Sequence, residues 1–383
     1  MNRVYLVLLL FISLVINIIA QSHIRFNHLT LEDGLSQSAV TCIFQDKNGF
    51  MWFGTQDGLN RYDGYSFKIF RNNPKDSTTI SDNFIFSIYE DLNGILYIET
   101  LGGTFNKYNP LTESFTIVTK DSIDLISAKF NSVGAMFIES PGIIWSGGLS
   151  KAIGLTRENR ITGEITHFKH DSSDPSTLIN DKVYSVFKDH SGNVWVGTYN
   201  GLDKLDEKSG KFSHFKNDPN NSNSLADNWV WPIYEDKREI LWIGTVKSGI
   251  SAYNPKTNSF VNYKNDPNDP QSLNDNFVFS IYEDRSGVIW IGTQTGGINY
   301  FHPASNVIEH YVSTPGAKNT LSDNSVLSMC VDNAGHYWIG TNKGGLDRFD
   351  YKSGKFKNFS NVSSNSRGTP FKKVPVFIKF NRT

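Results

Sequence analysis

One phrase occurs seven times along this chain of 383 residues, at an almost constant interval. Its first copy has Asp46, a glycine three residues later and Trp52, followed by a Gly-Thr pair. A repeat of this length is typical of an array whose units bury their apolar faces by stacking on their neighbours. The central aromatic residue recurs at Trp52, Tyr97, Trp145, Trp195, Trp242, Trp290 and Trp338, in steps of 45 to 50 residues.

The sixth copy indicates what one unit forms. Residues 277–282 are β-branched and aromatic, and 288–293 and 298–301 are similar, so each predicts a short strand. Between the first two, Asp284 and Gly287 stand at the first and fourth positions of a tight turn, and residues 294–297 form a second turn that ends in two glycines. Residues 307–311 add a fourth strand. Four short strands joined by hairpins predict one blade of a β-propeller.

We therefore predict an all-β fold, a seven-bladed β-propeller with four antiparallel strands per blade. A β-sandwich usually lacks so regular a repeat, and the coils of a parallel β-helix are shorter. The propeller is expected to occupy residues 21–360. Residues 361–383 contain several Lys and Arg but no acid and no repeat phrase, so we expect a poorly ordered or truncated tail.

The seven units contain one outer-strand segment more than they need. A segment like the fourth strand of each unit also precedes the first unit, at residues 25–29. A ring is well closed when its last blade takes its outer strand from the other terminus, because this covers a sheet edge. We predict that 25–29 pairs with 346–350 of the seventh unit and that 355–359 is the spare strand.

The N-terminus predicts export. Residues 1–20 contain Arg3, an apolar run to Ile19 and then Ala20, which is the order of a secretory signal peptide. An uncleaved anchor helix is the alternative. We expect a mature chain that begins near Gln21, is periplasmic or secreted, and has no membrane span after the signal peptide. The net charge of −1 gives no reason to expect a nucleic acid partner.

The chain has two cysteines, Cys42 and Cys330. They fall on the predicted innermost strands of the first and seventh units, which are neighbours if the ring closes. A disulfide needs Cα atoms within about 7 Å, and strands of adjacent blades diverge. We therefore expect two free, buried thiols.

The repeated phrases resemble a known family. Residues 29–36 and 50–64, with the recurring Ile-Tyr-Glu-Asp and Trp-Ile-Gly-Thr phrases, resemble the two-component regulator propeller over residues 24–360. The resemblance implies the periplasmic sensor region of a Bacteroidetes hybrid two-component regulator, which in that family commonly recognises oligosaccharides. Full sensors of the family usually carry a second ring, a third β-domain, a transmembrane helix and a kinase. We expect a standalone or truncated sensor without its kinase, whose partners are an oligosaccharide or other small ligand and a second propeller or sensor protein.

Candidate ligand contacts are residues that break the repeat where loops enter the first strand or join the second to the third. Trp229 and Trp231 stand where other units have Phe, and Pro232 stands where they have Ser. A flat aromatic face beside amide and ammonium donors suits a sugar. Packing of both tryptophans against the next blade is the alternative. The candidate ligand-binding residues are Trp229, Trp231, Tyr199, Lys247, Gln294, Asn342, Lys343, Gln56 and Asp57.

The sequence does not predict catalysis. A glycosidase needs two positioned carboxylates, and nearly every recurrent acid here belongs to a repeat turn. Glu99 stands where Gly is usual and has no identifiable partner in the sequence, and the histidines lack the spacing of metal ligands. We expect no enzymatic activity, no cofactor and no metal. The alternatives are a protein-interaction scaffold and a propeller-fold enzyme that acts on glycans.

Overall fold

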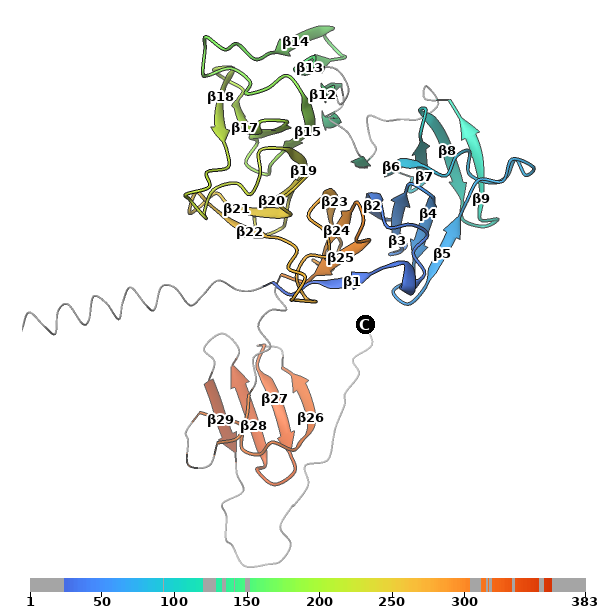
Figure 1. Cartoon of the computed structure of the whole chain (residues 1–383). Coiled ribbons are helices and arrows are strands. Elements are labelled where there is room, and N and C mark those ends of the chain that lie inside the picture. The colour runs from blue at the N-terminus through green and yellow to red at the C-terminus, as the bar shows by residue number, and fades with distance from the viewer. Residues whose placement is uncertain are drawn as a thin grey trace, which may run out of the picture. The chain divides into compact units, whose positions relative to one another are not determined.

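The computed structural model describes residues 24–91, 93–119, 129–132, 136–140, 142–148, 152–303, 311–314, 316, 319–332, 335–350 and 355–359. Within these residues the chain is all-β, apart from one short 3-10 helix, η1 (Leu31–Asp33). The strands form seven antiparallel sheets, one for each repeat (Figure 1). The predicted fold class, a seven-bladed β-propeller with four antiparallel strands per blade, is confirmed.

The chain divides into two units, residues 1–306 and 307–383. The first unit contains the sheets of repeats one to six, and within each repeat the inner strand comes first in chain order. Repeat one contains β2 (Val40–Gln45), β3 (Met51–Thr55), β4 (Gly58–Tyr62) and β5 (Phe67–Phe70), and repeat two contains β6 (Ile85–Glu90), β7 (Leu96–Thr100), β8 (Thr104–Asn109) and β9 (Ser114–Val118), with β10 (Lys129–Ser132) as a fifth strand beside β6.

The next four sheets follow the same order. Repeat three contains β11 (Met136–Ser140), β12 (Ile143–Gly147), β13 (Leu155–Asn159) and β14 (Glu164–Phe168), and repeat four contains β15 (Val183–Lys188), β16 (Val194–Thr198), β17 (Gly201–Asp206) and β18 (Lys211–Phe215). Repeat five contains β19 (Val230–Glu235), β20 (Leu241–Thr245), β21 (Ile250–Asn254) and β22 (Ser259–Tyr263), and repeat six contains β23 (Val278–Glu283), β24 (Ile289–Thr293) and β25 (Ile298–Phe301).

The second unit contains one described sheet, that of repeat seven. Its strands are β26 (Val326–Val331), β27 (Tyr337–Thr341), β28 (Leu346–Asp350) and β29 (Lys355–Phe359), and they pair in that order.

The repeated aspartate and tryptophan hold the turn between the first and second strands. Asp46 Oδ1 accepts hydrogen bonds from the amides of Asn48 and Phe50 at 2.9 and 3.1 Å, and its Oδ2 accepts one from Trp52 Nε1 at 2.8 Å. The repeat phrase is therefore a structural clamp. The same aspartate–indole bond, 2.7 to 3.0 Å long, joins Asp189 to Trp195, Asp236 to Trp242, Asp284 to Trp290 and Asp332 to Trp338.

The glycine two residues after the tryptophan lets neighbouring blades approach. A Cβ atom at Gly54 would lie 2.7 Å from the Ile85 side chain of the next blade, and one at Gly292 would lie 2.6 Å from the Val40 carbonyl. The second contact places repeat six beside repeat one. The inner strands β11, β15, β19, β23, β2 and β6 contact one another in that order (Figure 1).

The prediction for ring closure is wrong. The N-terminal strand β1 (Asn27–Leu29) pairs with β25, with Leu29 opposite Ile298, and so completes the sheet of repeat six. Repeat seven is completed by its own strand, because β29 pairs with β28. The contacts of Phe26 explain the choice: its ring is 3% exposed and packs edge-to-face on Phe301 at 5.2 Å. Residues 307–311, the predicted fourth strand of repeat six, lie outside the described residues except for Tyr311.

Both cysteines are free, as predicted, but only Cys42 is buried. Burial raises the pKa of the Cys42 thiol to about 12. Cys330 is exposed, contrary to the prediction, as are its neighbours Met329 and Val331 on β26. The strand that carries Cys42 lies between β6 and β23, so its neighbours come from repeats two and six.

None of the helices in the described part of the chain has the length and apolar character needed to cross a membrane. The predicted signal peptide, residues 1–20, and the predicted tail, 361–383, lie outside the described residues.

Candidate functional site

In repeats two and four to seven, the turn that joins the second and third strands lies beside the residue that precedes the first strand. The amide of Tyr199 donates to the Lys182 carbonyl at 3.1 Å, and the amide of Gln294 donates to the Phe277 carbonyl at 3.0 Å. In repeat five the Val246 amide does the same to Trp229 at 3.2 Å. The turn candidates therefore lie at the same end of their blades as the aromatic residues that begin the inner strands.

The inner strands of repeats four, five and six are paired irregularly near their starts. The pairing skips Tyr184 in β15 and Phe279 in β23, and in β19 it skips both Trp231 and Pro232. Proline has no amide hydrogen to give to the sheet, which explains the wider irregularity in β19. Bulges of this kind re-aim side chains and often lie next to binding sites.

Six aromatic rings meet across repeats four, five and six, and we call them the aromatic cluster: Tyr184, Tyr199, Trp229, Trp231, Phe277 and Phe279. Trp229 lies 5.0 Å from Tyr199 and 5.7 Å from Tyr184, measured between ring centroids. Trp231 lies 5.3 Å from Tyr184, 5.4 Å from Phe277 and 5.5 Å from Phe279. Tyr199 is 46% exposed, whereas Tyr184 and Phe279 are buried and both tryptophans are partly buried. The cluster therefore has one exposed ring over a covered interior.

Several polar atoms at this place are shielded from solvent and have no hydrogen-bond partner in the described structure. They are Nε1 of Trp231, Oδ2 of Asp227 and Oγ of Ser185. Nε1 of Trp229 is also shielded; it lies close to the Tyr184 hydroxyl without forming a well-aligned hydrogen bond. A buried polar group without a partner costs about 1–3 kcal/mol, so their concentration at one junction makes this junction the candidate site.

Basic side chains border the cluster. The Lys182 ammonium lies 5.0 Å from the centroid of the Tyr199 ring, and Lys247 is exposed on the turn between β20 and β21. Burial, followed by the nearby Tyr199 phenol, raises the pKa of Tyr184, which keeps its hydroxyl protonated.

The remaining candidates lie elsewhere. Gln294 is exposed on the corresponding turn of repeat six, and Gln56 on that of repeat one. Asp57 is engaged in its own turn: it pairs with Arg71 at 3.1 Å and accepts a hydrogen bond from Asn83 at 3.1 Å. Such contacts favour a structural role for Asp57.

Two candidates, Asn342 and Lys343, belong to the second unit. The Asn342 amide donates to the Ser325 carbonyl at 2.9 Å, and the Lys343 amide donates to Asp323 at 2.7 Å. The turn thus has the same construction as those of the first unit, and a role of these two residues in binding stays a prediction.

Sequence reasoning missed Tyr184, Asp227 and the role of Glu99. Tyr184 has the same place in its repeat as Trp231, so the same comparison of repeats could have found it. Glu99 accepts a hydrogen bond from Ser87 Oγ at 2.7 Å, a contact that the sequence did not reveal. No group of three His, Cys, Asp or Glu side chains within the described residues could hold a metal ion.

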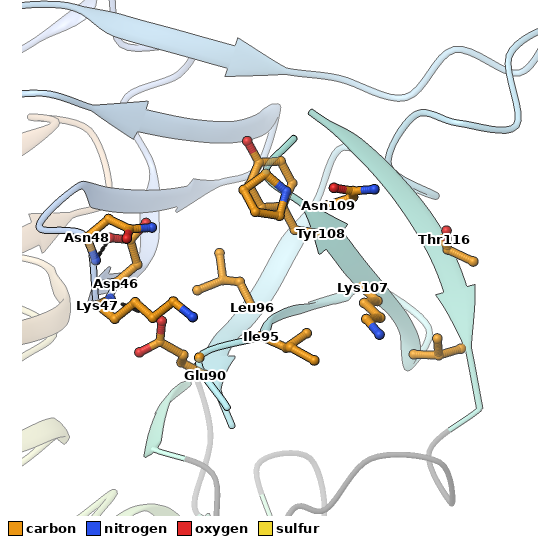
Figure 2. A pocket seen from close by; sticks show the side chains of 13 residues that line it. Asp46, Lys47, Asn48, Glu90, Ile95, Leu96, Lys107, Tyr108, Asn109 and Thr116 are labelled. Atoms are coloured by element: carbon orange, nitrogen blue, oxygen red, sulfur yellow. Dashed lines mark hydrogen bonds between the residues drawn. The ribbon is translucent and has the colours of Figure 1, made fainter. Parts of the chain in front are cut away.

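A cavity of about 670 Å³ lies at the opposite end of the blades, between repeats one and two (Figure 2). Lys47 and Glu90 line it, and the Lys47 amide donates to Glu90 at 3.0 Å. The Lys47 ammonium donates to the Asn93 carbonyl at 3.0 Å. Because these polar groups already join the two blades to each other, the cavity is a weaker candidate than the aromatic cluster.

Comparison with known proteins gives both a family match and partial relatives. Histidine kinase P4 of Formosa agariphila is 57% identical over 74 residues, which are 19% of this chain and 5% of that protein. Two solved extracellular domains of Bacteroides thetaiotaomicron, assigned to a hybrid and to a one component system, are 25% and 21% identical, with TM-scores of 0.49 and 0.46. The matches cover 90% and 88% of this chain, and it spans about half of each of theirs, 50% and 54%.

The family match covers the parts of the repeats that build the site. The two component regulator propeller pattern matches residues 34–57, 177–200, 224–247, 272–295 and 320–343. Each matched segment runs from the loop before the first strand to the turn after the second strand. The chain therefore contains repeats of the two component regulator propeller family, matched in repeats one and four to seven, as its sequence predicts.

Proposed function

We propose that this protein is the exported sensor module of a two-component signalling system and that it recognises an oligosaccharide at the aromatic cluster. The family of its repeats and its similarity to a segment of a histidine kinase support the signalling role. The predicted signal peptide supports export. The single observation that carries the ligand site is the junction of repeats four and five, where aromatic rings and unpartnered polar atoms come together.

The chemistry of this junction suits a sugar. A pyranose ring has apolar C–H faces that stack on indole rings, while its hydroxyls both donate and accept hydrogen bonds. The Trp231 indole offers a donor, and Asp227 offers an acceptor. The exposed Tyr199 ring lies 5.0 Å from the Trp229 ring, so it offers a second aromatic surface at the solvent side of the cluster.

The proposal assigns binding and no catalysis. The recurrent acids hold turns and indoles, as Asp46 and Asp189 do for Trp52 and Trp195. A carboxylate engaged in such a clamp is not available as a general acid or nucleophile, because its lone pairs accept structural hydrogen bonds.

The test is calorimetric titration of Trp229→Ala with the oligosaccharide that a glycan array selects for the unaltered protein. Loss of a partly buried aromatic contact should weaken binding by about 1–3 kcal/mol, a factor of roughly 5 to 150 in Kd. Phe84→Ala is the matched control, since Phe84 has the same position in repeat two. An unchanged Kd for Trp229→Ala would remove the residue from the site. Capture of a protein partner without any saccharide binding would favour the scaffold alternative.

A further inference from the structure

Repeats two, five, six and seven have an aspartate three residues before the inner strand (Asp82, Asp227, Asp275 and Asp323), and the bonds that it can make are visible in repeat six. Asp275 Oδ1 accepts a hydrogen bond from the Phe277 amide at 3.1 Å. Its Oδ2 accepts two from Thr295, from the amide at 2.7 Å and from the hydroxyl at 2.8 Å. The carboxylate thus fastens the turn between the second and third strands to the loop before the first strand. Asp323 does the same in repeat seven, accepting from the Lys343 amide at 2.7 Å.

Asp227 of repeat five departs from this arrangement. Its Oδ1 accepts a longer hydrogen bond, 3.4 Å, from the Trp229 amide. Its Oδ2 is shielded from solvent and has no partner, although Lys247 has the place in the turn that Thr295 has in repeat six. The turn itself is intact, because the Thr245 amide still donates to the Gly249 carbonyl at 2.9 Å. An acceptor that holds a turn elsewhere is therefore left unused in the one repeat that carries both tryptophans.

We propose that Asp227 is a specificity-determining residue: its Oδ2 accepts a hydrogen bond from a hydroxyl of a neutral saccharide whose ring rests on Trp229 and Trp231. This rests on the proposed function of the aromatic cluster. Nε1 of Trp231 supplies a donor to the same ligand. Since a sugar hydroxyl both donates and accepts, a neutral saccharide can satisfy both groups at once.

The Asp227 carboxylate should also determine which saccharides the site excludes. A buried acceptor discriminates strongly against an analogue that lacks the hydroxyl, because the acceptor is then left unpaired. A uronic acid would bring a second carboxylate towards Asp227, and like charges at short range repel in a site that excludes water. Lys182 and Lys247 at the border could offset part of that repulsion, so acidic sugars are included in the test.

The first experiment needs no ligand. Thermal unfolding is compared for Asp227→Asn and Asp275→Asn in the full chain. Asp275→Asn removes a carboxylate that has partners and should lower the Tm by several degrees. Asp227→Asn should leave the Tm unchanged or raise it, because Oδ2 of Asp227 makes no hydrogen bond that the substitution could remove. If Asp227→Asn lowers the Tm as much as Asp275→Asn, Asp227 holds its turn in solution and the proposal is overturned.

The second experiment measures binding. The probes are cellohexaose, xylohexaose, mannohexaose and hexagalacturonate, titrated by calorimetry. We expect the unaltered protein to bind at least one neutral probe, Asp227→Asn to bind it at least tenfold more weakly, and Asp275→Asn to stay within threefold. Equal binding by Asp227→Asn, with loss in Trp231→Ala, overturns the role of Asp227 and leaves the proposed function standing. Preference for hexagalacturonate overturns the neutral class. Failure of all four probes overturns both proposals.

Discussion

Replacing His214 with alanine should lower the free energy of unfolding by about 3 kcal/mol at pH 8, because it leaves a buried carboxylate without its partner. His214 on β18 faces Asp203 on β17, with 2.6 Å between Nδ1 and Oδ1. Its Nε2 lies 2.7 Å from the Pro175 carbonyl, and Asp203 Oδ2 accepts a hydrogen bond from the Ile179 amide at 2.7 Å. Asp203 is fully buried, whereas a quarter of the His214 side chain is exposed.

The effect should depend on pH in a defined direction. Burial raises the pKa of Asp203 from its usual 3.8 to about 6, although the hydrogen bond and charge of His214 lower it. The folded chain therefore binds this proton more tightly than the unfolded chain does. The stability that Asp203 contributes is present below pH 4 and is lost as the pH rises from about 4 to about 6. Without His214 the pKa of Asp203 should rise further, so the deficit of His214→Ala should be smaller at pH 5 than at pH 8.

Repeat seven provides the control. There Asn358 has the position of His214, and its Nδ2 donates to Asp347 at 2.6 Å and to the Thr320 carbonyl at 2.9 Å. His214→Asn should therefore keep both bonds without a titrating group and lose less than about 1 kcal/mol. Urea unfolding at pH 5 and pH 8 measures all three proteins. Equal deficits of His214→Ala at both pH values, or equal losses in the two variants, would refute this reasoning.

Two further predictions concern packing. Phe26→Ala should lower the free energy of unfolding in urea by about 3–4 kcal/mol, because its ring is almost fully buried against Phe301. Phe359→Ala, at a 41% exposed position, should lower it much less. The reverse order would favour closure of the ring by residues 25–29 on repeat seven. Gly54→Ala should lower the free energy of unfolding by about 1–3 kcal/mol, since the new Cβ would lie 2.7 Å from Ile85 and would also crowd Cys42 Sγ. Adding Cys42→Ala to this variant should recover part of the lost stability. If Gly54→Ala leaves the stability unchanged, these two blades do not approach so closely.

The repeat made the fold predictable, whereas the partners of the terminal strands could not be predicted from the sequence. The period, the Asp-to-Trp spacing and the small residue after the tryptophan each have a local cause, as the bonds of Asp46 and the surroundings of Gly54 show. The sequence pattern that marks a fourth strand is only five residues long, and several segments of the chain have it. Such a pattern fixes which side chains face the core and leaves the partner strand open. Burial of Phe26 against Phe301 made the choice in favour of repeat six.

The candidate site was predictable where a residue departs from its own repeat. Trp229 and Trp231 were identified in this way, and the structure brings Trp231 into contact with Tyr184 of the neighbouring blade. The lack of a partner for Asp227 was not predictable, since in sequence it matches Asp275. The difference lies in the partners of the second carboxylate oxygen, which Thr295 supplies to Asp275 and which Asp227 lacks.

Pairing of β1 with β25 has a consequence for how the protein folds during its synthesis. Leu29 and Ile298 are about 270 residues apart in the chain, so β1 leaves the ribosome long before its partner strand. At a synthesis rate of about 5–20 residues per second, β1 waits roughly 15–55 s before β25 exists. During that interval its backbone groups and the Phe26 side chain need another partner, such as a chaperone or the transport machinery. Pairings between such distant segments also form slowly, so completion of this strand pair is expected to be the late step in maturation.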